Sequence, residues 1–91
     1  MTLSELKFIV ALAQEKNFRK AAEKSFVSQP ALSLGIKKIE QELNLSLFER
    51  SVGAAGNVKI TPIGQKIIDP ATIVLEEAAK IKDLSVNGDK Q

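Results

Sequence analysis

The sequence predicts a mainly α-helical protein with three short helices, a small two-stranded β-hairpin and one long last helix. Three observations support this prediction. Apolar residues recur at helical spacing in three successive segments of the first 43 residues. A turn with two glycines then separates two short extended segments, and a Thr-Pro pair begins a final periodic segment. At 91 residues, the chain has the length of a single domain.

A first helix is expected at 3–15. Thr2 and Glu5 have the spacing of a capping box, in which each side chain accepts a hydrogen bond from the backbone N–H of the other residue. A stripe of apolar residues at helical spacing is expected to face the core. It consists of Leu6, Ile9, Val10 and Ala13.

A second helix is expected at 18–25, with Asn17 as its N-terminal cap. An Ala-Ala pair at 21–22 has side chains small enough to let another helix approach closely. Phe18 and Phe26 flank this helix and are expected to act as apolar plugs.

The third helix is expected to run from its cap, Ser28, to about Leu43 and to stop at Asn44. Proline is tolerated in the first turn, because its missing N–H has no helical partner to lose. On a helical projection one face is apolar and the opposite face is polar or basic, with Leu34 at the edge of the exposed face. The buried stripe is Leu32, Ile36, Ile39 and Leu43, and the exposed face is Gln29, Pro30, Ser33 and Lys37.

Residues 47–51 and 58–61 are expected to pair as a small hairpin. The second segment, "VKIT", alternates apolar and polar residues as a half-buried strand does. Between them, "VGAAGN" at 52–57 has the composition of a turn.

The last helix is expected to begin at Thr61-Pro62, a cap followed by a proline, and to reach about Ser85. Pro70 predicts a bend or break near Asp69, because an interior proline costs about 3 kcal/mol. Apolar residues spaced 4, 3, 4, 3 form a heptad seam, which suits either a partner helix or the core of the chain itself. The seam consists of Ile67, Ala71, Val74, Ala78 and Ile81.

Charge is distributed unevenly along the chain. The net charge is +2, but segment 16–38 carries +5, so the remaining residues carry −3. Such asymmetry indicates a polyanionic partner that faces one part of the molecule. The segment contains the cations Lys16, Arg19, Lys20, Lys24, Lys37 and Lys38 and the anion Glu23.

Residues typical of catalysis are scarce. Cysteine and histidine are absent, which excludes a disulfide framework, a thiolate zinc site and the commonest general base. Glu40 and Glu42 lie about 200° apart on the third helix and do not share a site. We therefore expect no enzyme, no metal site and no cofactor. No apolar run reaches the roughly 18–20 residues of a membrane span, and no signal-peptide pattern is present, so a cytoplasmic protein is expected.

The second and third helices together have the pattern of a helix-turn-helix, in which early residues of the last helix enter the DNA major groove. Gln29 can donate to and accept from an adenine edge, and Pro30 and Leu34 offer apolar contact to a thymine methyl group. Ser33 can bind a base or a phosphate, and Lys37 a phosphate or a guanine edge. The alternative is that these are ordinary solvent-facing residues.

Phosphate contacts are expected around this face. Ser28 and the free backbone amides at the start of the third helix suit a phosphate oxygen. A basic hairpin after a helix-turn-helix would lie along the DNA backbone or dip into the minor groove, although Arg50 could instead pair with Glu49 or a helix carboxylate. The expected backbone contacts are Arg19, Lys20, Ser28 and Lys38, and the expected wing contacts are Arg50 and Lys59.

Four strings, "AAEKSFVSQPALS", "IKKIEQEL", "LFER" and "TPIGQ", occur in an order and spacing that resembles the N-terminal winged helix-turn-helix of the LysR-type transcriptional regulators. The match runs from Leu3 to about Leu84. Within that family, "VALAQEKNFRKAAEKSFVSQPALS" is most similar to the peroxide-responsive OxyR branch, which implies control of an oxidative-stress response.

The resemblance also assigns roles to single positions. Gln29, Pro30 and Ser33 match base-reading positions of the family, and Arg50 matches its wing arginine. The family often has Arg-Gln after the serine, where this chain has "LG" at 34–35, so a cation is missing from the reading face. The glycine costs about 1 kcal/mol of helix propensity, which suggests close backbone packing there.

The resemblance further implies a homodimer formed through the long last helix, with two recognition helices in successive major grooves of a double-stranded, inverted-repeat operator. It divides the chain into a winged helix-turn-helix at 1–61, a linker and dimerisation helix at 62–86, and a frayed tail at 87–91 that would lead to an effector-binding domain absent from this chain. No effector ligand is then expected to bind here, and a tetramer is expected only of a longer protein.

A rival hypothesis, from another class of function, is a helical protein-interaction module whose apolar seam at 67–81 binds a partner helix. A gel shift against random duplex DNA at low salt separates the two hypotheses. No binding at micromolar protein would favour the rival.

Overall fold

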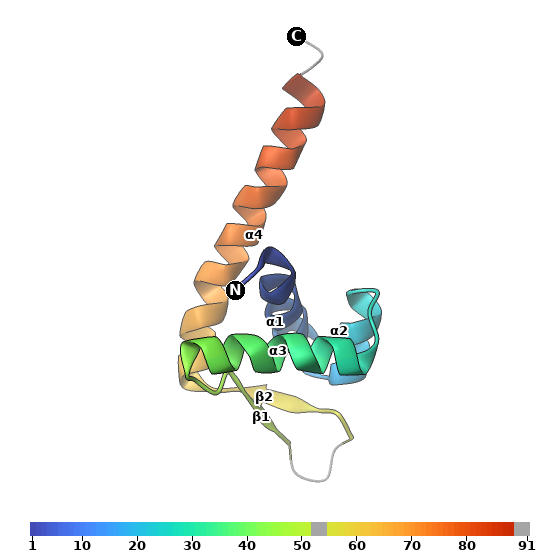
Figure 1. Cartoon of the computed structure of the whole chain (residues 1–91), viewed down its shortest axis with the longest axis vertical. Coiled ribbons are helices and arrows are strands. Elements are labelled where there is room, and N and C mark those ends of the chain that lie inside the picture. The colour runs from blue at the N-terminus through green and yellow to red at the C-terminus, as the bar shows by residue number, and fades with distance from the viewer. Residues whose placement is uncertain (52–54, 89–91) are drawn as a thin grey trace.

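The computed structural model describes residues 1–51 and 55–88, and side chains as far as residue 85. Three short helices form a body, a two-stranded antiparallel wing lies beside the third helix, and a long helix leaves the body (Figure 1). The predicted fold class is therefore confirmed. Part of the predicted turn, 52–54, lies outside the described residues. The elements are α1 (Leu3–Glu15), α2 (Phe18–Lys24), α3 (Gln29–Leu43), β1 (Phe48–Arg50), β2 (Val58–Ile60) and α4 (Pro62–Gly88).

The predicted caps of the first two helices are present. Thr2 Oγ1 accepts a hydrogen bond from the backbone N–H of Glu5 at 3.1 Å, and Glu5 Oε1 accepts one from that of Thr2 at 3.1 Å. Asn17 Oδ1 accepts a bond from the N–H of Lys20 at 3.0 Å and so begins α2. These bonds satisfy helix-end donors that would otherwise have no partner. The predicted stripe of α1 and the Ala-Ala pair of α2 are buried.

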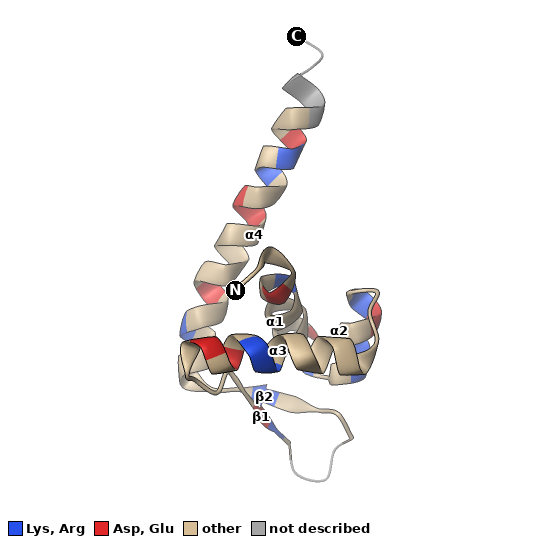
Figure 2. Ribbon diagram, viewed as in Figure 1, with Lys and Arg blue, Asp and Glu red and all other residues tan. Residues whose placement is uncertain are grey.

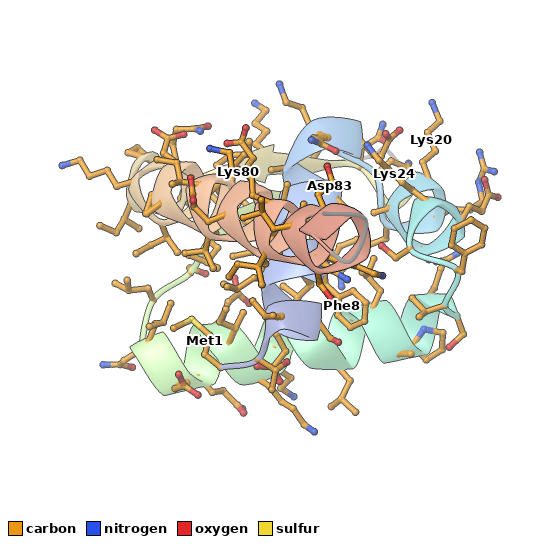
Figure 3. The ribbon with its side chains drawn as sticks, turned by 90° about the horizontal axis from the view of Figure 1, so that it is seen from above. Met1, Phe8, Lys20, Lys24, Lys80 and Asp83 are labelled. Carbon is orange, nitrogen blue, oxygen red and sulfur yellow. The ribbon has the colours of Figure 1, made fainter. Side chains whose placement is uncertain are left out.

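Helix α3 also begins and ends where its caps predict. Ser28 Oγ accepts a bond from the N–H of Ala31 at 3.2 Å, and Asn44 ends the helix in the left-handed conformation, with φ at 55°. The predicted buried stripe is confirmed except for Leu43, which is half-buried. Gly35 is buried as well: a Cβ there would lie 2.5 Å from the ring of Phe8 (Figure 3), so the close packing expected at this glycine is confirmed.

Phe26 is not an apolar plug. Its side chain is 93% exposed, and its backbone has a φ of 57°. The turn between α2 and α3 needs a left-handed residue at this position, and that conformation directs the ring away from the core. Phe18, the other predicted plug, does pack against the core and is half-buried.

The wing is joined to α3 by one carboxylate. Glu40 Oε2 accepts bonds from the N–H of Leu47 at 2.8 Å and from that of Phe48 at 3.4 Å. In the wing itself, Phe48 pairs with Ile60 and Arg50 with Val58. Glu40 therefore fixes where β1 begins relative to the third helix.

Helix α4 starts in a crowded corner beneath the wing. Thr61 Oγ1 accepts a bond from the N–H of Gly64 at 2.9 Å and donates to the carbonyl of Ser46 at 2.6 Å. A Cβ at Gly64 would lie 2.2 Å from the carbonyl oxygen of Leu47. The helix runs unbroken through Pro70 to Gly88, so the predicted break near Asp69 is wrong. Burial of Ile68 and Ala71 on either side of Pro70 helps to offset the helical hydrogen bond that the proline cannot make.

The two halves of α4 lie in different surroundings. Residues 62–75 lie beside the body, with Ile68 and Ala71 buried and Leu75 packed partly against the core, whereas residues 76–85 project away from it (Figure 1). The molecule is consequently elongated, with extents of 55 × 24 × 18 Å. No helix in the described ranges is long and apolar enough to cross a membrane.

The first residue of the chain contacts the far end of α3. The amino group of Met1 (Figure 3) donates to Glu42 Oε1 at 2.5 Å and lies 3.7 Å from Glu5 Oε1. The hydrogen bond that it donates to Glu42 is the main reason that the pKa of this amino group is raised above its ordinary value.

Candidate nucleic-acid interface

The predicted reading face of α3 is accessible. Leu34 is 54% exposed, Gln29, Pro30 and Lys37 are exposed, and Ser33 is half-buried. None of these side chains is needed to complete the core, so the face is free to contact a partner. We call these five residues the reading face.

A hollow separates the first turns of α3 from the wing. It has a volume of about 540 Å³ and is lined by Gln29, Pro30 and Ser33 on one side and by Arg50 on the other. Phe18 and Gly56 complete its lining. The fold therefore brings three of the predicted base-reading residues and the predicted wing arginine to a single open groove, although they lie up to 21 positions apart in the sequence.

A second, smaller hollow of about 190 Å³ continues along α3. Ser33 and Lys37 line it from the helix, and Arg50 and Val58 line it from the wing. Lys37 and Arg50 thus add positive charge to this hollow, and Figure 2 shows lysine or arginine on both α3 and the wing. Glu40 also lines this hollow, but its carboxylate accepts the two bonds from the wing backbone.

Arg50 has an aromatic neighbour rather than a carboxylate. Its guanidinium carbon lies 4.7 Å from the centroid of the Phe18 ring. Among residues 1–51 and 55–85, no carboxylate oxygen lies within 4.0 Å of it, so the alternative of an ion pair with Glu49 is wrong. The charge of Arg50 is consequently not neutralised by these residues.

Lys59 differs from Arg50 in its position on the wing. Side chains alternate between the two faces of a strand, and Phe48, Arg50 and Val58 share the face that lines the hollow beside α3. Lys59 lies on the opposite face, directly across from Glu49. The two predicted wing cations therefore do not face the same side.

Some of the residues that are predicted to contact the DNA backbone already make contacts within the chain. Arg19 pairs with Glu23 at 3.0 Å, but both side chains are exposed, and exposed pairs of this kind contribute little. Lys20 projects from α2 into solvent (Figure 3), and Lys38 is exposed on α3. The hydroxyl of Ser28 is used as a helix cap.

Contacts that the sequence did not reveal hold the returning strand of the wing to the corner between α1 and α2. Asn17 Nδ2 donates to Asn57 Oδ1 at 2.6 Å. The backbone N–H of Phe18 donates to the carbonyl of Gly56 at 2.9 Å, and that of Val58 donates to the carbonyl of Lys16 at 3.0 Å. The asparagines carry a signal of turns and caps, but that signal does not say which segment lies opposite.

The predicted heptad seam of α4 is divided by the fold. Ala71 is 4% exposed and lies in the chain's own core, and Ile67 packs partly against that core, so these two residues belong to the body. Val74 and Ile81 are 44% and 69% exposed, and Ala78 is half-buried. Exposed apolar residues within about 100° of arc on the helix form what we call the outer stripe: Ile73, Val74, Ile81 and Leu84.

Comparison with known proteins relates this geometry to a family. Residues 3–65 match the family of bacterial regulatory helix-turn-helix proteins named lysR. Over 91 residues, the whole chain is 38% identical to the hydrogen peroxide-inducible genes activator of Haemophilus influenzae, of which it covers 29%. The chain thus spans less than a third of the length of that curated relative.

Two solved structures have closely similar folds. Full-length OxyR C199D from Pseudomonas aeruginosa superposes with a TM-score of 0.88 and 50% identity, over 97% of this chain and 29% of that one. The BenM DBD in complex with catB site 1 DNA superposes with a TM-score of 0.89 and 32% identity, over 100% of this chain and 99% of that one. The second match extends through α4 as well as the body.

Proposed function

This chain belongs to the lysR family of bacterial regulatory helix-turn-helix proteins, and from that membership we propose that it binds double-stranded DNA sequence-specifically as a homodimer. It would then act as the DNA-binding part of a bacterial transcription regulator. The observation that carries the proposal is the hollow between α3 and the wing, which has Gln29, Pro30 and Ser33 on one wall and Arg50 on the other. The BenM DBD, which aligns over the full length of this chain, was solved in complex with DNA.

In the proposed complex the first turns of α3 enter the major groove. Gln29 reads an adenine edge, and Pro30 and Leu34 contact thymine methyl groups. Ser33 and Lys37 contact a base edge or a phosphate. An apolar residue at position 34, in place of the cation that the family often has there, shifts base preference toward a methyl group and lowers the electrostatic contribution to binding.

Phosphate contacts supply the part of the affinity that does not depend on sequence. Arg50 is the proposed wing contact, since it faces the hollow and has no carboxylate partner among the described residues. Lys59 contributes less, because it lies on the other face of the wing opposite Glu49. The proposed contacts on the helices are Arg19, Lys20, Ser28 and Lys38.

The proposed homodimer uses the outer stripe of α4 rather than the whole predicted seam. Val74 and Ile81 of this stripe belong to the predicted seam and Ile73 and Leu84 do not, while the half-buried Ala78 of the seam lies beside the stripe. Glu77 lies within the arc of the stripe, where its carboxylate pairs with Lys80 at 3.1 Å at the edge of the stripe. Apolar side chains exposed along one side of a helix are typical of a surface that a second helix covers.

Regulation by peroxide stress is a further part of the proposal. It is supported by similarity to the hydrogen peroxide-inducible genes activator and to OxyR over nearly the whole chain. The role assigned to this chain is binding without catalysis, metal or cofactor, and it would act in the bacterial cytoplasm, where chromosomal DNA lies.

Selection of bound sites from a random duplex pool tests the proposal directly. We expect enrichment of an inverted repeat, because two copies related by a two-fold axis present two reading faces. Recovery of no enriched sequence from a folded protein would contradict sequence-specific binding, and enrichment of a single half-site would contradict the dimer.

Replacement of Gln29 by Ala tests the reading face. We expect affinity for the selected site to fall by about 1–3 kcal/mol, with hardly any change on random duplex, because a base contact carries sequence information and a phosphate contact does not. Gln41→Ala is the matched control: it makes the same chemical change on an exposed residue of α3 about 18 Å further along the helix. Equal losses on both kinds of DNA would contradict base reading by Gln29.

A further inference from the structure

Phe18 occupies a fixed position between the body and the wing. It is the first residue of α2, and its half-buried ring packs against the core. Its backbone N–H donates to the carbonyl of Gly56, at the start of the returning segment of the wing, at 2.9 Å. Packing against the core therefore restrains the ring, and the backbone hydrogen bond holds the returning segment of the wing beside the residue that carries it.

The guanidinium of Arg50 lies over this ring. Its central carbon is 4.7 Å from the ring centroid, within the roughly 6 Å over which a cation is attracted to an aromatic face. Arg50 is the last residue of β1 and is exposed, so the ring is the contact that restrains its long side chain.

An aromatic partner has a different consequence from a carboxylate partner. A carboxylate would occupy guanidinium N–H groups and neutralise the charge, whereas a ring attracts the cation through its face and leaves the N–H donors at the edge of the guanidinium free. A long, flexible side chain also loses rotamer freedom on binding. A side chain restrained beforehand loses less, which favours binding.

The restrained charge lies at the hollow that the reading face also lines. Phe18 and Arg50 both line this hollow, together with Gln29, Pro30 and Ser33. A DNA strand held between α3 and the wing would therefore meet a guanidinium that is already in place and still charged.

We propose that Phe18 is a positioning residue for DNA binding: its ring holds Arg50 over the hollow between α3 and the wing, as a preorganised phosphate-binding cation. The proposal rests on the proposed function. It assigns no DNA contact to Phe18 itself, whose effect on binding passes through Arg50.

A double-mutant cycle with Phe18→Leu and Arg50→Ala tests this coupling. With Arg50 present, loss of the ring is expected to weaken duplex binding about two- to fivefold, the worth of an exposed cation–π contact. In the Arg50→Ala background the same replacement is expected to have no effect. Phe18→Tyr, which keeps the ring, is expected to bind as the wild type does. Equal weakening by Phe18→Leu in both backgrounds would mean a general structural role and would overturn the proposal.

The salt dependence of DNA binding distinguishes a residue that positions Arg50 from a residue that contacts phosphate itself. Arg50→Ala is expected to reduce the slope of log affinity against log salt by about 0.9, the value for one lost phosphate contact. Phe18→Leu is expected to leave the slope unchanged, because the guanidinium still reaches the phosphate, although less often. A slope reduced by Phe18→Leu as much as by Arg50→Ala would overturn the positioning role.

A measurement without DNA keeps the proposal independent of the binding assay. Protons held over an aromatic face are shifted upfield in the NMR spectrum, so the side-chain protons of Arg50 should be shifted in the wild type and in Phe18→Tyr. They should return to ordinary values in Phe18→Leu or, where that variant does not fold, in Phe18→Met. Ordinary Arg50 shifts in the wild type would overturn the proposal.

The two assays together distinguish the possible failures. A wild-type chain that shows the upfield shifts but binds no duplex would overturn the proposed function, and the role of Phe18 in DNA binding with it. A wild-type chain that binds a selected duplex, but in which Phe18 and Arg50 are not coupled, would overturn only the proposal made for Phe18.

Discussion

The body of the molecule and the outer half of α4 contain the same kinds of apolar residue in opposite surroundings. In the body, Ile39 is fully buried in the core, whereas Ile81 on α4 is 69% exposed. Both isoleucines lie on helices whose sequences show apolar residues at helical spacing. An amphipathic pattern thus predicts that a face will be buried, but it does not say whether the chain itself or a second molecule will cover that face.

Helix α4 contains the boundary between these two situations. Its residues 62–75 lie beside the body, and residues 76–85 extend from it (Figure 1). If the contrast is real, replacements in the body should change the free energy of unfolding, and replacements on the outer stripe should change association instead.

Gly64→Ala should have the largest effect. The new Cβ would lie 2.2 Å from the carbonyl oxygen of Leu47, which is backbone and cannot move aside as a side chain can. We expect a loss of about 4 kcal/mol or more in the free energy of unfolding, well above the roughly 1 kcal/mol gained in helix propensity. Chemical denaturation monitored by circular dichroism measures the change in the free energy of unfolding. Gly35→Ala should cost less, because the obstacle there is the ring edge of Phe8. A Gly64→Ala variant as stable as the wild type would mean that α4 is not joined to the wing as described.

Ile39→Ala should have the next largest effect. Its side chain is 0% exposed, and removal of such a buried side chain typically costs about 2–5 kcal/mol through lost burial and a residual cavity. Leu34→Ala, on the exposed face of the same helix, is the control and should change stability by no more than about 0.5 kcal/mol. Denaturant titration of the two variants at one protein concentration makes the comparison. Similar losses for both would contradict the assignment of buried and exposed faces to α3.

Ile81→Asp should have the smallest effect on folding of the body, within about 0.5 kcal/mol, because its side chain is 69% exposed. We expect it to weaken the homodimer by about 3 kcal/mol, roughly 100-fold, since a carboxylate would be buried there without a partner. Sedimentation velocity over a range of concentrations measures the association.

Ala79→Asp is the matched control for the outer stripe. It introduces the same carboxylate at an exposed position of α4 that lies about 160° around the helix from Ile81. It should leave association unchanged. If both replacements dissociate the dimer equally, or neither does, the outer stripe is not the surface through which two copies associate.

Much of the fold was predictable from local signals in the sequence. Side chains such as Thr2, Asn17 and Ser28 cap helices through bonds that span three residues, so the signal and its partner lie in one short segment. Such signals gave both ends of α1 and the start of each helix. The helical spacing of apolar residues, another local signal, placed the reading face on the exposed side of α3.

Other features depend on segments that are far apart in the sequence. Glu40 carries no sign that it will accept bonds from the backbone of the wing, and Phe18 carries no sign that it will lie under Arg50, 32 positions later. The exposure of Phe26 could not be read from its type, because hydrophobicity predicts burial while the backbone of the turn directs the ring outward. In each of these cases the contact or the exposure depends on how distant segments pack together, and neither composition nor periodicity reveals that packing.

Synthesis proceeds from the N-terminal to the C-terminal side of a chain, so the corner at Thr61 and Gly64 has a consequence for the order in which the body can form. All three helices of the body and both strands of the wing precede this corner in the chain. Ile68 and Ala71, which complete the buried interior, follow it. A nascent chain that has released the wing therefore still exposes the surface that α4 will cover. We therefore expect the body to close only when the first turns of its longest helix have emerged, so that the boundary predicted at residue 61 does not separate two independent folding units.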